Sequence, residues 1–137
     1  MRKVIFACVH NAGRSQMSAA FFNKFADPGK AIAISAGTQP AERVQPDVVE
    51  VMGNVGIDLS KAVPQKLTPE LAQDASLLIT MGCGDECPFV PGLKRGDWQI
   101  VDPKGKDLSQ VREIRDEIEN RVQQLIKSEG WGRNAAV

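Results

Sequence analysis

Short apolar runs alternate with segments of helical periodicity along this chain of 137 residues. The runs at residues 3–7, 31–35 and 76–81 are rich in aliphatic and β-branched side chains and predict buried strands. A fourth strand is predicted at residues 97–102. Because strands this apolar do not face water, we expect an α/β fold of three layers, a four-stranded parallel sheet with helices on both faces.

Helices are predicted between and after these strands. The first opens near Ser15 and ends near residues 27–30, where turn-forming residues cluster. The second begins at Pro46, and the third has Thr68 as its cap and Pro69 in its first turn. The apolar face of the first helix comprises Met17, Phe21 and Phe25.

The last helix has the clearest pattern in the sequence. Its apolar stripe comprises Val111, Ile114, Ile118, Val122 and Leu125. Charged side chains on the opposite face are spaced to pair as Arg112–Asp116, Arg115–Glu119 and Glu117–Arg121. We expect residues 128–137 to form a loose tail after this helix.

Composition and charge limit the classes of function. The length and a hydrophobic content of 42% fit a single domain over residues 1–137. With 17 basic and 17 acidic side chains, the net charge of zero argues against nucleic acid or a membrane as the main partner. The sequence shows neither a signal-peptide pattern nor a spanning apolar run, so we expect a cytoplasmic protein. Three cysteines in that reducing compartment indicate chemistry or a metal rather than a disulfide framework.

Cys8 directly follows the first predicted strand, and Arg14 comes six positions later, where a helix begins. In parallel α/β sheets, ligands bind beyond the carboxyl ends of the strands, where unpaired N–H groups attract anions. We expect Gly13 to take a positive φ that curls the loop, and Arg14 to bind two oxygens of an oxyanion. The same positive field favours the Cys8 thiolate, a nucleophile. The candidate residues of this loop are Cys8, His10, Asn11, Ala12, Gly13, Arg14 and Ser15.

A nucleophile of this kind needs a proton donor for its leaving group. Asp102 ends the predicted fourth strand, which places it on the same rim of the sheet as Cys8, and Pro103 stiffens the turn that follows. We therefore expect Asp102 to act as the general acid. His10, the only histidine, is expected to face solvent or a neighbouring helix, since the loop activates the thiol without it.

The motifs CVHNAGRSQM, SAGT, GIDLS, TMGCGDECP and VDP resemble those of the low-molecular-weight tyrosine phosphatase superfamily. Within it, the chain is similar to the arsenate reductases of the thioredoxin-coupled type, from residue 3 to about residue 127. The resemblance implies a flavodoxin-like topology, Cys8 as nucleophile, Arg14 as oxyanion ligand and Asp102 as general acid. It also implies that Asn11 and Ser15 hold the loop and keep the thiolate ready.

Two features favour a reductase over a phosphatase. The chain has no tyrosine, and Lys104 follows Pro103 where the phosphatases of this superfamily carry an aromatic clamp, so arsenate suits the cleft better than an aryl phosphate. Cys83 and Cys87 follow the third predicted strand, on the rim that holds Cys8. The resemblance implies a relay in which Cys83 attacks Cys8, Cys87 attacks Cys83, and thioredoxin reduces the final disulfide.

The reductant and the reaction class both stay open at this point. The spacing of Cys83 and Cys87 is narrower than in the best-known thioredoxin-coupled members, so an external small thiol or a glutaredoxin is a second candidate reductant. The sequence also allows hydrolysis of small phosphate esters and non-catalytic oxyanion sensing.

We expect no cofactor and no metal, because zinc on a set of Cys8, His10, Cys83 and Cys87 would block the nucleophile. Ala19 stands where some members carry a potassium-binding glutamate, so we expect no potassium dependence.

Overall fold

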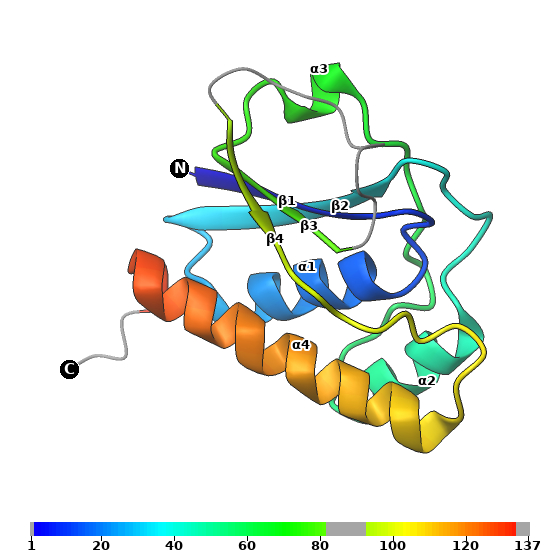
Figure 1. The fold of residues 1–137 in the computed structure, drawn as a ribbon. Coiled ribbons are helices and arrows are strands. Elements are labelled where there is room, and N and C mark those ends of the chain that lie inside the picture. The colour runs from blue at the N-terminus through cyan, green and yellow to red at the C-terminus, as the bar shows by residue number, and fades with distance from the viewer. Residues whose placement is uncertain (1, 82–92, 134–137) are drawn as a thin grey trace.

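The computed structural model describes residues 2–81 and 93–133 (Figure 1). Its centre is a parallel sheet in which the strands lie in the order β2-β1-β3-β4. The strand bounds are Arg2–Cys8 for β1, Ala31–Gly37 for β2, Leu77–Thr80 for β3 and Lys94–Asp97 for β4. This arrangement confirms the predicted four-stranded parallel sheet and its flavodoxin-like order.

Helices cover both faces of the sheet, but unequally (Figure 1). Helices α1, α2 and α4 lie together on one face, and α3 lies on the other. The helix bounds are Arg14–Phe25 for α1, Pro46–Gly53 for α2, Pro69–Ala72 for α3 and Leu108–Glu129 for α4. The predicted three layers are therefore confirmed, and in the described part of the chain the third layer holds the short helix α3, a single helical turn.

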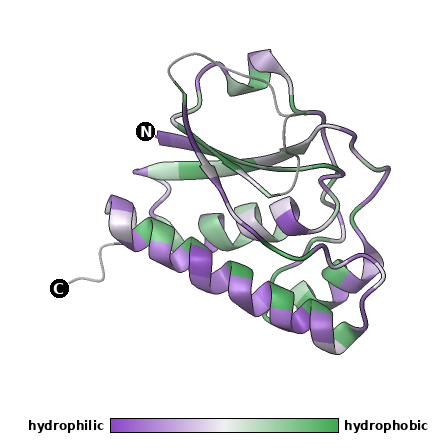
Figure 2. Ribbon diagram, viewed as in Figure 1, coloured by the Kyte–Doolittle hydropathy of each residue, from purple (hydrophilic) through white to green (hydrophobic). Residues whose placement is uncertain are grey.

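Alternation along β1 divides the core between the two faces of the sheet. Val4 and Phe6 join the larger core cluster under α1 and α4, while Ile5 and Ala7 join the smaller cluster near α3. All four side chains are fully buried. Figure 2 shows the apolar strands between the helices and the alternating apolar and polar bands along α4. Burial on both faces explains why the strands appear as continuous apolar runs in the sequence.

The cap predicted for the third helix is confirmed, and α4 has a capping box of its own. Thr68 Oγ1 accepts a hydrogen bond from Leu71 N at 3.1 Å and caps α3. Asp107 and Gln110 form a capping box at the start of α4. The predicted Glu117–Arg121 ion pair forms at 3.0 Å.

Arg115 departs from its predicted partner. The prediction paired it with Glu119, but its side chain donates to the main-chain oxygen of Val51 at 2.9 Å and contacts Asp116 at the same distance. The guanidinium thereby satisfies a carbonyl near the end of α2 and joins that helix to α4. A buried carbonyl without a partner would cost more than an exposed ion pair contributes, so the side chain turns inward.

The fourth strand lies earlier in the chain than predicted. β4 ends at Asp97, and the predicted strand at residues 97–102 leaves the sheet after Trp98, whose N–H donates to Thr80 O at 2.9 Å. β4 is a polar edge strand, so its sequence carries no apolar run. The apolar side chains of Trp98 and Ile100 pack against the larger core without strand pairing. Asp102 consequently stands in an irregular segment and not at the end of a strand.

The tail predicted at residues 128–137 is ordered as far as the structure describes it, which corrects the prediction for residues 128–133. α4 continues to Glu129, and Gly130 closes it with a left-handed φ of 73°. Trp131 O then accepts from Asp27 N at 2.8 Å, and its ring lies edge-on to Phe22 at 5.9 Å between centroids. Partial burial of this large ring against the core holds the segment in place. Residues 134–137 lie outside the described residues.

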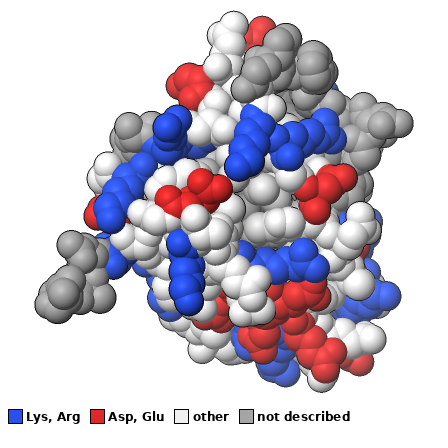
Figure 3. Space-filling model, turned by 60° about the vertical axis from the view of Figure 1, so that its left-hand side comes forward, with Lys and Arg blue, Asp and Glu red and all other residues white. Residues whose placement is uncertain are grey.

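The described surface carries both signs of charge. Figure 3 shows basic and acidic side chains interspersed over the face that it presents. No helix in the described ranges is long and apolar enough to cross a membrane.

Candidate active site

The candidate loop begins at the carboxyl end of β1, where Cys8 is the last strand residue, and ends where α1 begins at Arg14. It rests directly against the end of β2. A Cβ added to Gly37 would lie 2.6 Å from Val9 O and 2.9 Å from Asn11 N, closer than real contacts allow. Glycine at position 37 therefore permits the close packing of the loop on the sheet.

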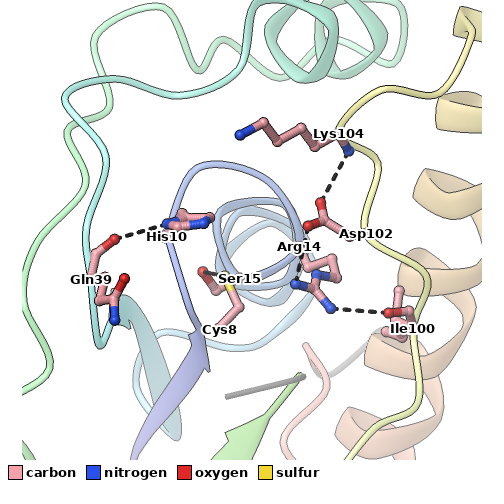
Figure 4. A network of polar contacts seen from close by, with 8 residues as sticks. All are labelled: Cys8, His10, Arg14, Ser15, Gln39, Ile100, Asp102 and Lys104. Carbon is pink, nitrogen blue, oxygen red and sulfur yellow. Dashed lines mark hydrogen bonds and ion pairs between the residues drawn. The ribbon is translucent and has the colours of Figure 1, made fainter. Parts of the chain in front are cut away.

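The thiol of Cys8 is buried and bound to a serine. Cys8 is 3% exposed, and its Sγ lies 2.9 Å from Ser15 Oγ (Figure 4). Asn11 Nδ2 donates to the same hydroxyl oxygen at 2.7 Å. Ser15 therefore connects the amide of Asn11 to the thiol of Cys8.

The direction of this hydrogen-bond chain follows from the other end of Asn11. Its Oδ1 accepts from the main-chain N–H of Gln65 at 2.9 Å and from Gln16 Nε2 at 3.2 Å. Because a main-chain N–H only donates, the amide oxygen faces Gln65 and the amide nitrogen faces Ser15. Ser15 accepts from Asn11, which leaves its own hydroxyl proton free to be donated to the sulfur of Cys8. Such a hydroxyl can donate to a negatively charged sulfur.

The backbone turn of the loop lies at Asn11 and not at Gly13. Asn11 has a φ of 51°, whereas Gly13 has a φ of −146°. The prediction for Gly13 was wrong because asparagine also tolerates the left-handed region and is held there by its side-chain hydrogen bonds. Gly13 serves close approach instead, since a Cβ at this position would lie 3.0 Å from Pro103 Cγ.

Arg14 joins the loop to the irregular segment that carries Asp102. Its Nη1 donates to Ile100 O at 3.1 Å, and its Nη2 lies 3.7 Å from Asp102 Oδ2 (Figure 4). Asp102 Oδ1 accepts from the main-chain N–H of Lys104 at 3.0 Å. These contacts bring Asp102 beside Cys8 although no strand positions it. Both residues line one small pocket, whose lining comprises Cys8, His10, Ala12, Gly13, Arg14, Gln45 and Asp102.

His10 is turned toward the neighbouring loop and not toward the thiol. Its Nδ1 lies 3.0 Å from Gln39 O, and since a carbonyl only accepts, Nδ1 carries the proton (Figure 4). The ring is held beside the pocket and makes no hydrogen bond with Cys8 in the described structure. This orientation agrees with the expectation that the loop works without histidine as a base.

Two predicted site residues, Cys83 and Cys87, lie outside the described residues. Among the described residues, no group of three or more His, Cys, Asp or Glu side chains is arranged to hold a metal. Ala19 is buried in α1.

Sequence reasoning missed several residues that build the site. Gln65 and Ile100 act through main-chain atoms, so no motif marks them. Gly37 stands in the SAGT motif, but the motif does not indicate that the loop packs against it. The main-chain N–H of Gln45 donates to Ala12 O at 2.9 Å. Gln45 directly precedes Pro46, so its place in the sequence indicates the start of a helix and does not indicate a residue of the pocket.

The family described as low molecular weight phosphotyrosine protein phosphatase matches residues 3–130. The chain belongs to that family. The match includes Cys8, Arg14 and Asp102, so it covers every residue of the pocket.

Its relatives include named arsenate reductases. The chain is 36% identical to the "Glutaredoxin arsenate reductase" of Synechocystis over 92% of this chain and 97% of that protein. A solved thioredoxin-dependent arsenate reductase of Corynebacterium glutamicum is 39% identical, with a TM-score of 0.81 over 93% of this chain and 61% of that longer chain. An arsenate reductase of Archaeoglobus fulgidus is 34% identical, with a TM-score of 0.79 over 90% and 98% of the two chains.

The hydrogen bond from Ser15 predicts the reactivity of Cys8. In Ser15→Ala, alkylation of Cys8 by iodoacetamide at neutral pH should slow about tenfold, the equivalent of one charge-assisted hydrogen bond. Peptide mass spectrometry separates Cys8 from the other two cysteines. Ser18→Ala is the matched control, since this buried hydroxyl of the same helix bonds Arg14 O and Met81 Sδ and not Cys8. Equal alkylation rates in wild type and Ser15→Ala would contradict the proposed direction of the hydrogen-bond chain.

Proposed function

We propose that this protein is an arsenate reductase in which the Cys8 thiolate attacks arsenic. The observation that carries the proposal is the hydrogen-bond chain through Asn11 and Ser15, which aims a donor at Cys8 inside an oxyanion loop. Arg14 and Asp102 stand at the same pocket. The named activities of the Synechocystis, Corynebacterium and Archaeoglobus relatives support the choice of arsenate.

The first step joins sulfur to arsenic. Main-chain N–H groups of the loop and the guanidinium of Arg14 bind the oxyanion and neutralise its charge. The Cys8 thiolate attacks arsenic, and one arsenic–oxygen bond breaks. Asp102 gives its proton to the departing oxygen, which leaves as water or hydroxide. The product of this step is a Cys8–arsenic(V) adduct.

Two electrons then pass to arsenic. The Cys83 thiolate attacks the sulfur of Cys8, a disulfide forms between them, and the electron pair of the sulfur–arsenic bond stays on arsenic. Arsenic leaves as arsenite. Cys87 attacks Cys83 in turn, which frees Cys8 and moves the disulfide to the pair of later cysteines. The roles of Cys83 and Cys87 rest on the sequence alone.

Thioredoxin is the proposed reductant of the final disulfide. The three cysteines of the chain and the name of the Corynebacterium relative support it. The name of the Synechocystis relative favours a glutaredoxin or small thiol that reduces the adduct without Cys87. Either reductant places the reaction in a reducing compartment, which we propose is the cytoplasm.

The role of Asp102 separates an enzyme from an oxyanion sensor. Asp102→Asn should lower the rate of arsenate turnover about 100-fold, because the leaving oxygen loses its proton donor. Binding of arsenate, measured by calorimetry, should change by less than about threefold, since the loop and Arg14 keep the oxyanion. Asp74→Asn is the matched control on an exposed carboxylate that pairs with Lys3. A sensor would show no arsenate turnover even as wild type.

The reductant is identified by arsenate-dependent NADPH oxidation with purified thioredoxin and thioredoxin reductase. Wild type should turn over, and Cys83→Ser and Cys87→Ser should each lose at least about 100-fold of that rate, since each removes one thiol of the relay. The same assay with glutathione, glutaredoxin and glutathione reductase tests the second reductant. Turnover of Cys87→Ser at the wild-type rate with either reductant would contradict the internal relay.

A further inference from the structure

The carbonyl groups of the oxyanion loop are engaged on its outer side. The carbonyls of residues 8–12 accept hydrogen bonds at 2.8 to 3.3 Å, four of them from main-chain N–H groups of segment 38–45 and one from Gln16 Nε2. The described peptide bonds are all trans, and a trans peptide points its N–H away from its C=O. The N–H groups that follow these carbonyls therefore point to the other side, where the pocket lies.

The loop consequently offers only donors to an oxyanion. Its main-chain N–H groups and the Arg14 guanidinium donate hydrogen bonds and cannot accept them. Oxygens that carry no proton bind well there. A protonated oxygen of the anion is itself a donor, so it must turn to the other polar side chains of the pocket wall, which are those of His10, Gln45 and Asp102.

His10 presents an acceptor to this pocket. Its Nδ1 donates to Gln39 O at 3.0 Å, so Nε2 of the neutral imidazole holds a lone pair. Figure 4 shows the half-buried ring over the loop, with Gln39 on one side and Cys8 and Arg14 on the other. The bond to Gln39 thus leaves the opposite edge of the ring, with Nε2, toward the pocket. The part of the chain that the structure describes gives Nε2 no hydrogen-bond partner.

The other two side chains are less suited to accept. Asp102 Oδ1 already accepts from the main-chain N–H of Lys104 at 3.0 Å, and the proposed mechanism uses Asp102 as a proton donor. Gln45 turns its amide nitrogen, a donor, toward the loop, since a Cβ added to Gly13 would lie 3.5 Å from Gln45 Nε2. His10 is therefore the acceptor that a protonated oxyanion meets.

We propose that His10 Nε2 accepts a hydrogen bond from the hydroxyl of the bound oxyanion and thereby selects hydrogen arsenate and hydrogen phosphate over sulfate. Sulfate has the same tetrahedral shape but carries no proton at neutral pH. Its fourth oxygen would face the lone pair of Nε2 without a hydrogen between them, and two facing acceptors lower the affinity. The inference rests on the oxyanion site of the proposed function.

The same hydrogen bond determines which oxygen of arsenate leaves. The hydroxyl is held on the side of His10 and Asp102, while the unprotonated oxygens stay on the loop. The Cys8 thiolate attacks arsenic, a sulfur–arsenic bond forms and the bond from arsenic to this hydroxyl breaks. Asp102 gives the hydroxyl a second proton, so that it leaves as water. His10 accepts a hydrogen bond and transfers no proton.

Phosphate and sulfate are the probes, because at pH 8 both are tetrahedral dianions and only phosphate carries a proton. Free imidazole is neutral at this pH. Calorimetric titration of the reduced wild type should give a dissociation constant at least about tenfold lower for phosphate than for sulfate, the effect of one charge-assisted hydrogen bond.

Variants separate the acceptor of His10 from its bond to Gln39. In His10→Asn, the amide nitrogen can replace Nδ1 as the donor to Gln39 O, but no atom replaces Nε2, so the preference for phosphate should fall to less than about threefold. His10→Ala loses both bonds and should lose the preference as well. Gln39→Ala is the matched control, because it keeps the main-chain oxygen that accepts from His10 and should keep the full preference.

The outcomes distinguish this role of His10 from the reductase, since neither probe requires turnover. Equal affinities for the two anions in wild type, no binding of either anion, or a preference that survives in His10→Asn overturns the inference. Arsenate turnover by a chain without the preference leaves the reductase standing. A preference that depends on His10 in a chain that does not reduce arsenate overturns the reductase alone.

Discussion

The hydrogen bond from the main-chain N–H of Gln65 to Asn11 Oδ1 determines the chemistry of this site. It orients the amide of Asn11, whose other end then makes Ser15 an acceptor and leaves the serine proton for Cys8. The same bond helps to hold Asn11 in its left-handed conformation, which bends the loop. One contact with a distant segment thus orients the side chain that bends the loop and that holds the Ser15 hydroxyl beside Cys8.

Two different kinds of structure position the two reacting groups. Cys8 ends a strand that is paired on both sides, so the sheet holds the thiol rigidly. Asp102 lies in an irregular segment, and its position depends on the contact of Pro103 with Gly13 and on the bonds of Arg14. The position of Asp102, the proposed general acid, therefore depends on the loop of Cys8. A glycine at position 13 leaves the room that Pro103 needs beside this loop.

The buried parts of the fold were predictable, because burial on both faces produces continuous apolar runs in β1, β2 and β3. β4 was not, because an edge strand of polar residues carries no such signal, and the apolar residues after it pack without pairing. In the site, Cys8 and Arg14 were marked by their place between a strand and a helix. The parts missed were main-chain donors such as Gln65 N and the φ of Asn11, which depend on tertiary contacts that local sequence does not encode.

The central claim is that Cys8 attacks arsenic and is oxidised as arsenite forms. It is tested most directly in a single turnover of Cys87→Ser, mixed with arsenate in the absence of any reductant, quenched in acid and mapped by peptide mass spectrometry. We expect one arsenite per chain and a disulfide between Cys8 and Cys83. Arsenite released while Cys8 stays a free thiol, or no arsenite at all, would contradict the claim.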